Sequence, residues 1–591
     1  MLRKPLFLFC IPFLALLLPG CENHPSPATQ TPPNILIVLT DDQGWGDLGI
    51  HGNTNIRTPF LDSLARSGTR FANFYVQPVC SPTRAELLTG RYASSLGVYS
   101  TSAGGERMDP DVPTLGSIFQ NAGYRTGLFG KWHNGSQPPY HPNFRGFGEF
   151  YGFASGHWAH YFSPELERNG EFVRGHGYLA DDLTDQVIAF TTQPDPRPFL
   201  AVLSLNTPHS PMQVPEPYWA RLKQRPISLR HRDPEAEDTL FTRAALAMVE
   251  NIDTNVGRVL SALREQNLQN NTLVVFLSDN GPNSYRWNGG MKGRKGSTDE
   301  GGVRSPLIVS WPGHIPEGQL LRSVGAGVDL LPTLAALAGV SLPTGVRLDG
   351  FDLSAGITGT GAENRPGLIF NHWNGKTSVR SQRFRLDAEN QLYDIENDPG
   401  QQEDVSTRFP KMHDSLLRAR NRWLLENVSE TNTQRPFTLG YPGSGQTVLP
   451  ARDATAGSPV RRSNRFPNAS YMTGWDREAG GISWPVELLS EGTFEVTAYY
   501  ACTEATAGTR LWMTTRTDSV GRTIETAFES EAYGMEQDRV PRIESYAKDF
   551  RPLPLGQIGL SPGRDTIRLH AGPFAPGANL EIQRLVFRRM D

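Results

Sequence analysis

The sequence predicts an α/β fold: a mainly parallel mixed sheet flanked by helices, joined to a small α+β subdomain and followed by an all-β module of jelly-roll type. Short runs of apolar, β-branched residues, of which Ile35 to Leu39 is the clearest, are typical of strands buried on both faces. These runs alternate with stretches of helical periodicity, which favours parallel strands joined through helices. Beyond residue 447 the helical periodicity disappears, and short strands separated by glycine and proline turns replace it.

The helices of the α/β part are predicted from their end signals. Thr58-Pro59 opens a helix that reaches Ala65, with Gly68 beyond it as a stop. Pro113 to Ala122 is another, since proline is tolerated in a first helical turn, and Gly123 ends it. A longer amphipathic stretch runs from about 239 to 266. Further apolar runs predict strands at 126–129, 200–205, 273–277 and 307–309.

Around Ser378 the sequence pattern changes from long apolar runs to short polar segments. Short polar strands are predicted at 378–387 and 391–394, and a helix follows at 409–425. A stretch rich in Thr, Gly and Pro separates this part from predicted strands at 480–486, 493–500, 510–514 and 566–570. We therefore expect an α/β domain at 34–370, a small subdomain at 371–428, a linker at 429–447 and a β-sandwich module at 448–591.

Composition narrows the possible functions. The 591 residues include 57 Lys and Arg against 61 Asp and Glu, a net charge of −4, and no long basic run, which argues against nucleic acid as the main partner. The 38% hydrophobic content fits a soluble globular protein rather than one with many membrane spans. Four cysteines in a chain of this length cannot build a disulfide scaffold.

The N-terminus predicts export. Arg3 and Lys4 precede an apolar run, Leu6 to Leu18, that is too short to span a bilayer and matches the core of a signal peptide. The run ends in Leu18-Pro19-Gly20-Cys21, which resembles a bacterial lipobox and predicts a signal at 1–21 with a lipid anchor on Cys21. Cleavage and secretion without a lipid is the alternative. We expect a bacterial protein of the periplasm, outer membrane or cell surface, with membrane contact only through that anchor.

Polar residues follow several of the apolar strands. In open parallel sheets ligands bind at the carboxyl ends of the strands, so clusters at those ends are expected to converge. The clusters are Asp41-Asp42, Gly130-Lys131-Trp132-His133, Asn206-Thr207-Pro208-His209 and Ser278-Asp279-Asn280-Gly281. Any one of them has an ordinary explanation as a turn former. As a set, Asp41, Asp42, Asp279 and Asn280 offer only oxygen ligands, which predicts a site for Ca²⁺ or Mg²⁺.

A cysteine begins a predicted helix in Pro78-Val79-Cys80-Ser81-Pro82-Thr83-Arg84. That position places Cys80 at the positive end of a helix dipole, where an anion is stabilised. From this pattern alone, Cys80 is either a reactive thiolate of low pKa or an inert buried thiol.

Four ordered blocks resemble one enzyme family. Cys80-Ser81-Pro82-Thr83-Arg84, with Leu87-Leu88-Thr89-Gly90 after it, matches the C-x-P-x-R signature of sulfatases, and Gly123 to His133 is similar to their second signature. Lys295 to Pro306 resembles the K-G-x-x-x-E-G-G-x-R-x-P block, and Leu392 to Pro399 a motif of the C-terminal subdomain. Residues 34 to 428 thus look like a type I, formylglycine-dependent sulfatase with an alkaline phosphatase-like fold.

The resemblance implies a role for each residue. Cys80 would be oxidised to formylglycine by a maturation enzyme during export, and the hydrated aldehyde would be the nucleophile and a ligand of the metal, which is Ca²⁺ rather than Mg²⁺ in such enzymes. Arg84 would hold the hydrated aldehyde between Lys131 and His133, with His133 as the base that collapses the sulfated intermediate. His209 and Lys295 would bind sulfate and protonate the leaving oxygen.

Aromatic and histidine-rich segments suggest where a substrate binds. His157 to Tyr161 and Arg174-Gly175-His176 lie in loop-like stretches, and loops at strand ends usually supply specificity. The candidate residues are His157, His160, Arg174, His176 and His372, although ordinary packing explains each one equally well. The C-terminal sandwich resembles carbohydrate-binding modules, which favours a sulfated polysaccharide or oligosaccharide as substrate, and a structural cap is the alternative.

Two other functions remain open at this level. A phosphodiesterase or phosphonate monoester hydrolase of the same superfamily would share these motifs. A non-catalytic glycan-binding protein is disfavoured because every expected catalytic position is filled.

Overall fold

The computed structural model describes residues 1–2, 31–361, 364–428, 435–467, 469–475 and 480–591. The predicted signal core and Cys21 lie outside these residues. The chain divides into two compact units, 1–32 and 33–591, and every helix and strand named below belongs to the second. Within the described ranges, no helix is both long enough and apolar enough to cross a membrane.

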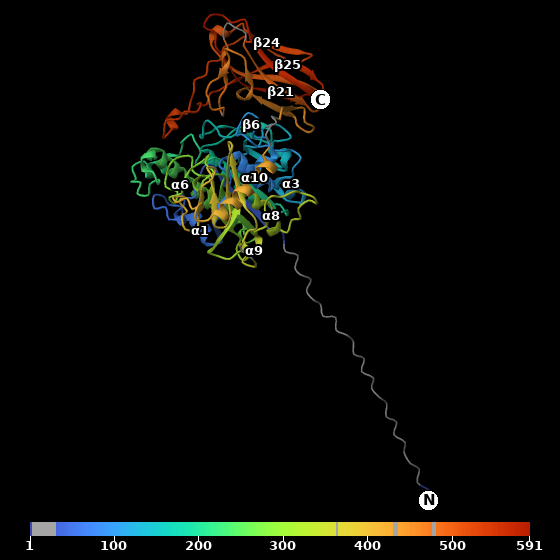
Figure 1. The fold of residues 1–591 in the computed structure, drawn as a ribbon. Helices are drawn as coiled ribbons and strands as arrows, with labels where there is room; N and C mark the ends of the chain where they lie inside the picture. The colour runs from blue at the N-terminus through green and yellow to red at the C-terminus, as the bar shows by residue number, and fades with distance from the viewer. Residues whose placement is uncertain (3–30, 362–363, 429–434, 468, 476–479) are drawn as a thin grey trace. The chain divides into compact units, whose positions relative to one another are not determined.

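A large mixed sheet forms the centre of the α/β part (Figure 1), which confirms the predicted fold class. Its five middle strands run parallel in the order β8, β1, β7, β3, β4. Ile35 of β1 lies opposite Leu200 of β7 and Leu273 of β8. The bounds are Asn34–Thr40 for β1, Arg125–Lys131 for β3, Glu149–Phe153 for β4, Phe199–Ser204 for β7 and Thr272–Ser278 for β8.

The edges of this sheet are largely antiparallel and were mostly missed from the sequence. One edge holds β10 (Leu307–Ser310), β2 (Thr69–Tyr75), β11 (Gln319–Ala326) and β9 (Arg304–Ser305), with β2 and β11 parallel to each other. The other edge ends in the hairpin of β5 (Glu165–Arg168) and β6 (Glu171–Arg174). Arg174 therefore ends a strand rather than lying in a loop, because hairpin pairing orders a polar segment that has no apolar run.

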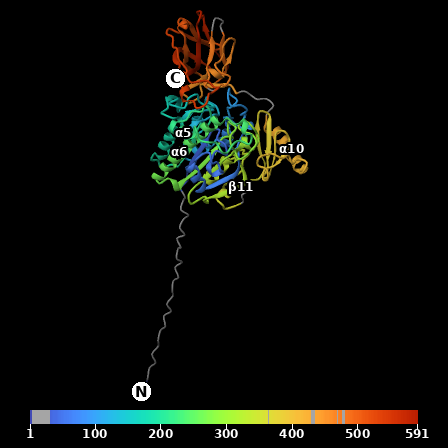
Figure 2. The ribbon, with the colours of Figure 1, turned by 90° about the vertical axis from the view of Figure 1, so that its left-hand side faces the viewer.

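Successive side chains of a strand point to opposite faces of the sheet, and in the central strands both sets are apolar. Helices therefore cover both faces. Ile35, Ile37 and Leu39 pack on the face covered by α2 (Cys80–Thr89), α3 (Leu115–Asn121) and α8 (Leu330–Leu337). Leu36 and Val38 pack on the opposite face, covered by α1 (Pro59–Arg66), α4 (Leu179–Thr192) and α6 (Thr239–Glu265). Figure 2 shows α6 beside α5 (Glu216–Leu222).

Helix α3 begins two residues later than Pro113 predicts. Thr114 accepts a hydrogen bond from the backbone of Ser117, whose hydroxyl bonds back to the Thr114 N–H. This reciprocal capping box fixes the helix start at Leu115. Two shorter helices are α7 (Glu300–Val303) and α9 (Ser354–Ile357).

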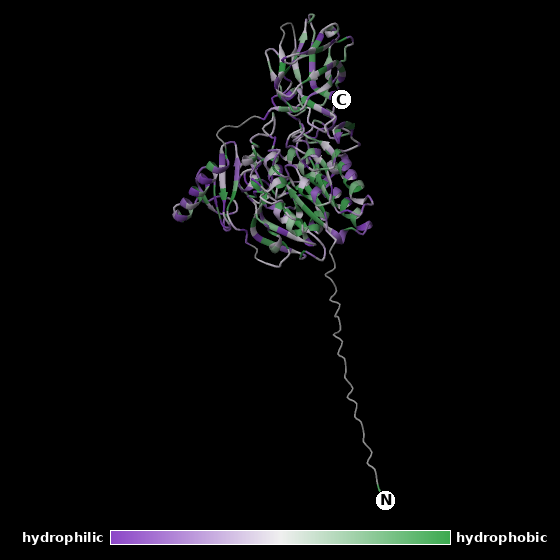
Figure 3. Cartoon of the chain, turned by 90° about the vertical axis from the view of Figure 1, so that its right-hand side faces the viewer, coloured by the Kyte–Doolittle hydropathy of each residue, from purple (hydrophilic) through white to green (hydrophobic). Residues whose placement is uncertain are grey.

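A four-stranded antiparallel sheet and a long helix form the next part of the chain. The strands are β12 (Ile369–Trp373), β13 (Lys376–Arg380), β14 (Phe384–Leu386) and β15 (Leu392–Asp394), and the helix is α10 (Pro410–Asn427). The segment 378–387, predicted as short strands and turns, contains the end of β13, a turn and then β14. Figure 3 shows α10 as largely hydrophilic, which agrees with the few buried residues of this helix.

Two six-stranded sheets make up the C-terminal part and share one hydrophobic core. One contains β16 (Phe437–Leu439), β18 (Thr455–Ala456), β21 (Gly481–Leu488), β23 (Arg510–Thr514), β24 (Ser519–Thr523) and β26 (Gly563–Gly572). The other contains β17 (Gln446–Pro450), β19 (Arg461–Arg462), β20 (Met472–Trp475), β22 (Gly492–Cys502), β25 (Arg551–Leu560) and β27 (Leu580–Arg589). We call this pair of sheets the β-sandwich; its jelly-roll topology stays a prediction.

The stretch predicted as a linker, 429–447, contains β16 and the start of β17. Phe437 and Leu439 are buried in the core of the β-sandwich, a packing that the local Thr, Gly and Pro content did not indicate. The domain boundaries derived from the sequence stay predictions.

Candidate active site

The carboxyl ends of β1 and β8 bring the four predicted oxygen ligands together. The backbone N–H of Asp42 donates to Asp279 Oδ1 at 3.2 Å, and Asn280 Nδ2 donates to Asp42 Oδ1 at 2.7 Å. Asp41, Asp42, Asp279 and Asn280 are all fully buried. They meet because β1 and β8 are adjacent parallel strands whose ends lie at the same edge of the sheet.

Helix α2 places Cys80 beside these carboxylates. Cys80 is the first residue of the helix and is buried. Its Sγ, one carboxylate oxygen of Asp41 and one of Asp279 all lie within 4.8 Å of one another. The N-terminus of a helix carries partial positive charge, so an anionic group at position 80 is favoured there.

Arg84 connects α2 to the ends of three strands. Its Nε and Nη2 donate to Asp279 Oδ2 at 3.1 and 2.8 Å. Its Nη1 donates to the carbonyl of Lys131 at 2.9 Å and to Ser204 Oγ at 2.6 Å. The guanidinium group of Arg84 thus forms hydrogen bonds with residues at the ends of three strands. These bonds hold α2 in one position relative to the sheet.

Three cationic or imidazole groups surround the aspartates. Lys131 Nζ lies 2.7 Å from Asp41 Oδ2, and Lys295 Nζ lies 2.7 Å from Asp42 Oδ1. His209 Nε2 lies 3.6 Å from Asp42 Oδ2. The Lys131 side chain is fully buried, whereas those of Lys295 and His209 are 21% and 14% exposed. Lys295 and His209 are thus the groups of this cluster that an incoming ligand can reach.

The two adjacent aspartates differ in proton affinity. Burial raises the pKa of Asp41 to about 6, and the negative charge of Asp42 adds to the effect. Burial acts on Asp42 in the same direction, but Lys295 and His209 lower the pKa of Asp42 below its ordinary value. Like charges this close are stable together only when a cation compensates them.

The donor set fits a hard divalent cation. Asp41 Oδ1 and Asn280 Oδ1 are buried oxygens without a hydrogen-bond partner among the described residues. Asp41, Asp42 and His209 also offer ligand atoms within 4.8 Å of one another. Buried oxygens left unpaired beside clustered carboxylates are what Ca²⁺ or Mg²⁺ would satisfy.

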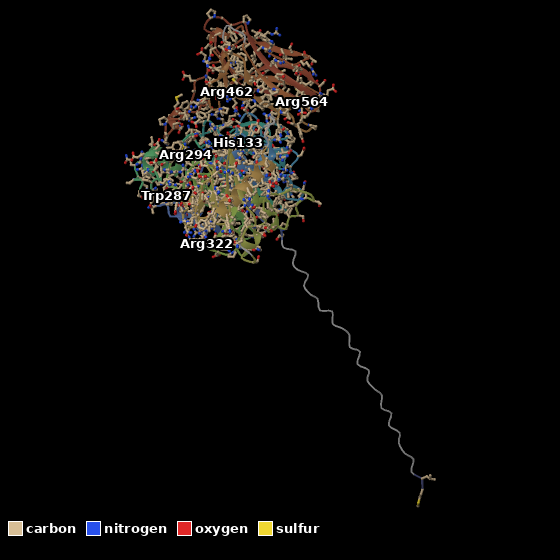
Figure 4. The ribbon with its side chains drawn as sticks, in the orientation of Figure 1. His133, Trp287, Arg294, Arg322, Arg462 and Arg564 are labelled. Carbon is tan, nitrogen blue, oxygen red and sulfur yellow. The ribbon has the colours of Figure 1, made fainter. Side chains whose placement is uncertain are left out.

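His133 stands on the loop that follows β3 (Figure 4), with a backbone φ of 70°. Its Nε2 lies 2.8 Å from the carbonyl oxygen of Thr101, and its buried Nδ1 has no partner among the described residues. Burial and the nearby Lys131 hold the pKa of His133 well below its usual range. The imidazole is therefore neutral, with Nε2 as the donor and Nδ1 free to accept a proton.

The predicted substrate residues do not all lie together. The ring of His157 stacks on His209 with centroids 5.3 Å apart, and His160 meets Tyr533 of the β-sandwich edge-on at 5.4 Å. His372 lies in β12, where its Nδ1 is 2.7 Å from Thr377 Oγ1. The remaining two are Arg174, at the end of β6, and His176, an exposed residue whose backbone N–H bonds Asp182.

Three contributors to the site were missed from the sequence. Ser204, the last residue of β7, accepts from Arg84 and donates to the carbonyl of Lys131 at 2.6 Å. Ser210 donates to Glu544 Oε1 at 2.8 Å. Ser204 ends the apolar run of β7, and that run by itself predicts only a strand residue at this position. Glu544 follows Ser210 by 334 residues, and no local pattern predicts contact over that separation.

Comparisons with known proteins agree on one family. The family described as Sulfatase matches residues 33–340. The chain is 34% identical over 371 residues to N-acetylgalactosamine-6-sulfatase of Canis lupus familiaris, covering 57% of this chain and 68% of that protein. It is 36% identical over 372 residues to arylsulfatase A of Homo sapiens, covering 58% and 71%.

A solved structure shows the same fold. The structure of Ps i-CgsB in complex with k-i-k-neocarrahexaose aligns with a TM-score of 0.62 and 31% sequence identity. The alignment covers 68% of this chain and 95% of that chain.

Proposed function

This chain belongs to the sulfatase family, whose members are sulfuric ester hydrolases, and from that premise we propose that it releases sulfate from a sulfated polysaccharide or oligosaccharide. The nucleophile in this proposal derives from Cys80, converted to formylglycine, and works beside a divalent cation. The observation that carries the proposal is the meeting of Cys80 with Asp41 and Asp279 within 4.8 Å, at the N-terminus of a helix that Arg84 holds in place.

The residues that would hold the cation are Asp41, Asp42, Asp279 and Asn280, with Ca²⁺ preferred over Mg²⁺ by resemblance. When bound, the cation polarises sulfate oxygens and neutralises the carboxylates around it. A hydrated formylglycine at position 80 supplies a hydroxyl nucleophile, and its second hydroxyl allows the C=O bond to re-form as sulfate leaves.

The surrounding side chains balance the negative charge of the sulfate group and transfer protons. Arg84 and Lys131 are fixed cations beside position 80 and orient the nucleophile. Lys295 and His209 are the partly exposed members of the cluster, so they are placed to bind the sulfate group and protonate the leaving oxygen. His133 accepts a proton at Nδ1, which has no partner among the described residues, while its Nε2 donates to the carbonyl of Thr101.

A sulfated carbohydrate is the substrate class that the relatives favour. One relative is named for N-acetylgalactosamine-6-sulfate chemistry, and the structure of Ps i-CgsB contains a neocarrahexaose. The proposal includes export of a bacterial precursor through the signal predicted at 1–21, oxidation of Cys80 by a maturation enzyme, and a lipid on Cys21. It also assigns a carbohydrate-binding role to the β-sandwich.

The reaction class is tested by comparing aryl sulfate and aryl phosphate esters of the same alcohol. We expect kcat/KM for the sulfate ester to exceed that for the phosphate ester, because the relatives of this chain are sulfatases. A panel of defined sulfated oligosaccharides, with free sulfate as the readout, then identifies the sugar. A preference for the phosphate ester by orders of magnitude would instead support a phosphoesterase of the same superfamily.

Removing the cation is expected to lower kcat/KM by at least about 100-fold, since metal polarisation contributes several kcal/mol to such reactions. The measurement is sulfate release after treatment with a chelator, with metal content checked by elemental analysis, and Ca²⁺ should restore activity better than Mg²⁺.

Asn280→Ala should weaken Ca²⁺ binding in a calorimetric titration by at least about tenfold. Asn270→Ala, at an exposed position, is the matched control and should bind Ca²⁺ as the unaltered chain does. Full activity in metal-free enzyme would refute the metal assignment.

A further inference from the structure

A cavity of about 580 Å³ lies between the α/β part and the β-sandwich, both within the unit 33–591. One wall comes from the segments around Ala154 to His160 and β5–β6, and the other from residues 443–452, 469–471, 547–550 and Arg584. Its volume falls within the range of about 300–1,000 Å³ that is usual for small-ligand sites.

A long connection between β24 and β25, residues 524–550, supplies Tyr533 and residues 547–550 to the cavity wall. Gln213 Nε2 donates to Asp538 Oδ1 at 2.8 Å and to the carbonyl of Gly534 at 2.9 Å. Arg539 donates to the carbonyl of Val214 at 3.0 Å. These contacts anchor the connection on the same loop after β7 that carries His209, so the cavity wall is fixed relative to the active site.

The cavity lies next to the catalytic cluster. Ala154 lines the cavity, and its carbonyl accepts a hydrogen bond from the backbone N–H of His133 at 3.2 Å. Trp158 and His160 also line it and follow directly on His157, whose ring stacks on His209. The segment 154–160 thus presents one side to the reacting groups and the other to the cavity.

The cavity lining combines aromatic rings with cations. Apart from the histidines, the aromatic members are Phe144, Trp158, Phe172, Tyr471, Tyr533 and Phe550. Such rings stack on the apolar faces of sugars, while charged and polar groups fix the substituents.

Among the described lining residues, three of the four acidic ones have an arginine or histidine partner. Glu165 pairs with Arg584, Glu167 lies 2.5 Å from His141, and Glu171 pairs with Arg588. Asp549 is exposed. Among the described residues, no carboxylate lies within 4.0 Å of Arg174, and the only such neighbour of Arg452 is its sequence neighbour Asp453 at 3.9 Å. Arg174 and Arg452 are therefore the lining cations available to an acidic group of a ligand.

We propose that this cavity binds a second, anionic sugar residue of the substrate chain, next to the sugar that carries the reacting sulfate, and that Arg452 and Arg174 contact its acidic substituent. This inference rests on the proposed function. It makes the β-sandwich part of the substrate site and predicts that the enzyme prefers oligosaccharides longer than one sugar.

The test measures binding separately from turnover. The Cys80→Ala chain, which cannot turn over, is titrated with k-i-k-neocarrahexaose and with a chondroitin sulfate hexasaccharide, each beside its own disaccharide. We expect at least one hexasaccharide to bind at least about tenfold more tightly than its disaccharide, since an added charged contact is worth about 1.4 kcal/mol or more. Adding Arg452→Gln should remove most of that difference, and adding Trp158→Ala should reduce it.

Arg564→Ala is the matched control, because Arg564 is an exposed arginine of the β-sandwich outside the cavity lining. It should leave the ratio of the two affinities as it is. Equal affinities for hexasaccharide and disaccharide with both probes, or a ratio that Arg452→Gln does not change, would overturn the inference. Failure of the proposed function looks different: the unaltered enzyme would release no sulfate from any member of the panel, whatever the binding data show.

Discussion

Replacing Cys80 by alanine is expected to abolish sulfate release, with a fall in kcat of at least about 10³-fold, as for loss of a covalent nucleophile elsewhere. Alanine has no sulfur to oxidise, so no formylglycine can form. The fold should survive, because the change removes a single atom from the first residue of α2 while Arg84 keeps its four hydrogen bonds. Sulfate release and the thermal midpoint of the same preparation are the two measurements.

A serine at the same position makes a sharper control. Cys80→Ser keeps a hydroxyl that can attack sulfur, but it has no second hydroxyl with which to expel the sulfate. We expect at most one sulfate per chain to be transferred and then retained, visible by intact mass spectrometry. Multiple turnovers by either variant would contradict the assignment of Cys80, and an unmodified thiol in active enzyme would contradict the formylglycine mechanism.

Replacing Glu300 by glutamine is expected to lower the free energy of unfolding by about 3–5 kcal/mol, the usual effect of breaking a buried charge cluster. Glu300 is fully buried and lies 2.8 Å from Arg385 Nε and 3.5 Å from Arg380 Nε. Tyr75 Oη donates to its other oxygen at 3.0 Å. Without the carboxylate, two buried guanidinium groups lose their shared counter-charge. The measurement is the midpoint of denaturant unfolding.

The pH dependence of this effect has a defined sign. Burial opposes ionisation of Glu300, but Arg385 and Arg380 hold its pKa below the ordinary value of 4.5. Its contribution is therefore fully present above about pH 4.5 and is lost as the pH falls through the lower folded-state value. Unaltered protein and Glu300→Gln should converge in stability at acid pH.

An exposed pair provides the control for Glu300. Glu403 and Arg408 form an ion pair at 3.4 Å with side chains 67% and 55% exposed. Glu403→Gln should change the free energy of unfolding by less than about 1 kcal/mol at every pH, because surface ion pairs contribute little. If both variants behave alike, the cluster around Glu300 does not stabilise the fold as described.

Much of the site was predictable because the relevant signals are local. An apolar run followed by Asp41-Asp42, and another followed by Asp279-Asn280, identify strand ends, and the parallel arrangement brings such ends to one edge. The motif around Cys80 identified both the helix start and the family. These patterns required no knowledge of contacts distant in the sequence.

Other features could not be predicted, since their signals are not local. Strands such as β2 and β6 are stabilised by pairing with neighbours rather than by an apolar run of their own. Phe437 and Leu439 lie in a stretch whose composition is typical of a linker, but both side chains are buried in the core of the β-sandwich.

By itself, the sequence determined the fold class, the sulfatase family and the cluster of Asp41, Asp42, Cys80, Asp279 and Asn280. It did so because short local sequence patterns predict where strands end and where helices begin. The tertiary structure alone decided that Ser204 supports Arg84 and that the connection 524–550 packs on the loop carrying His209. Gln213 and Asp538 lie 325 residues apart in the chain. Contacts of that kind depend on how two folded parts fit together, and no local sequence pattern encodes that fit.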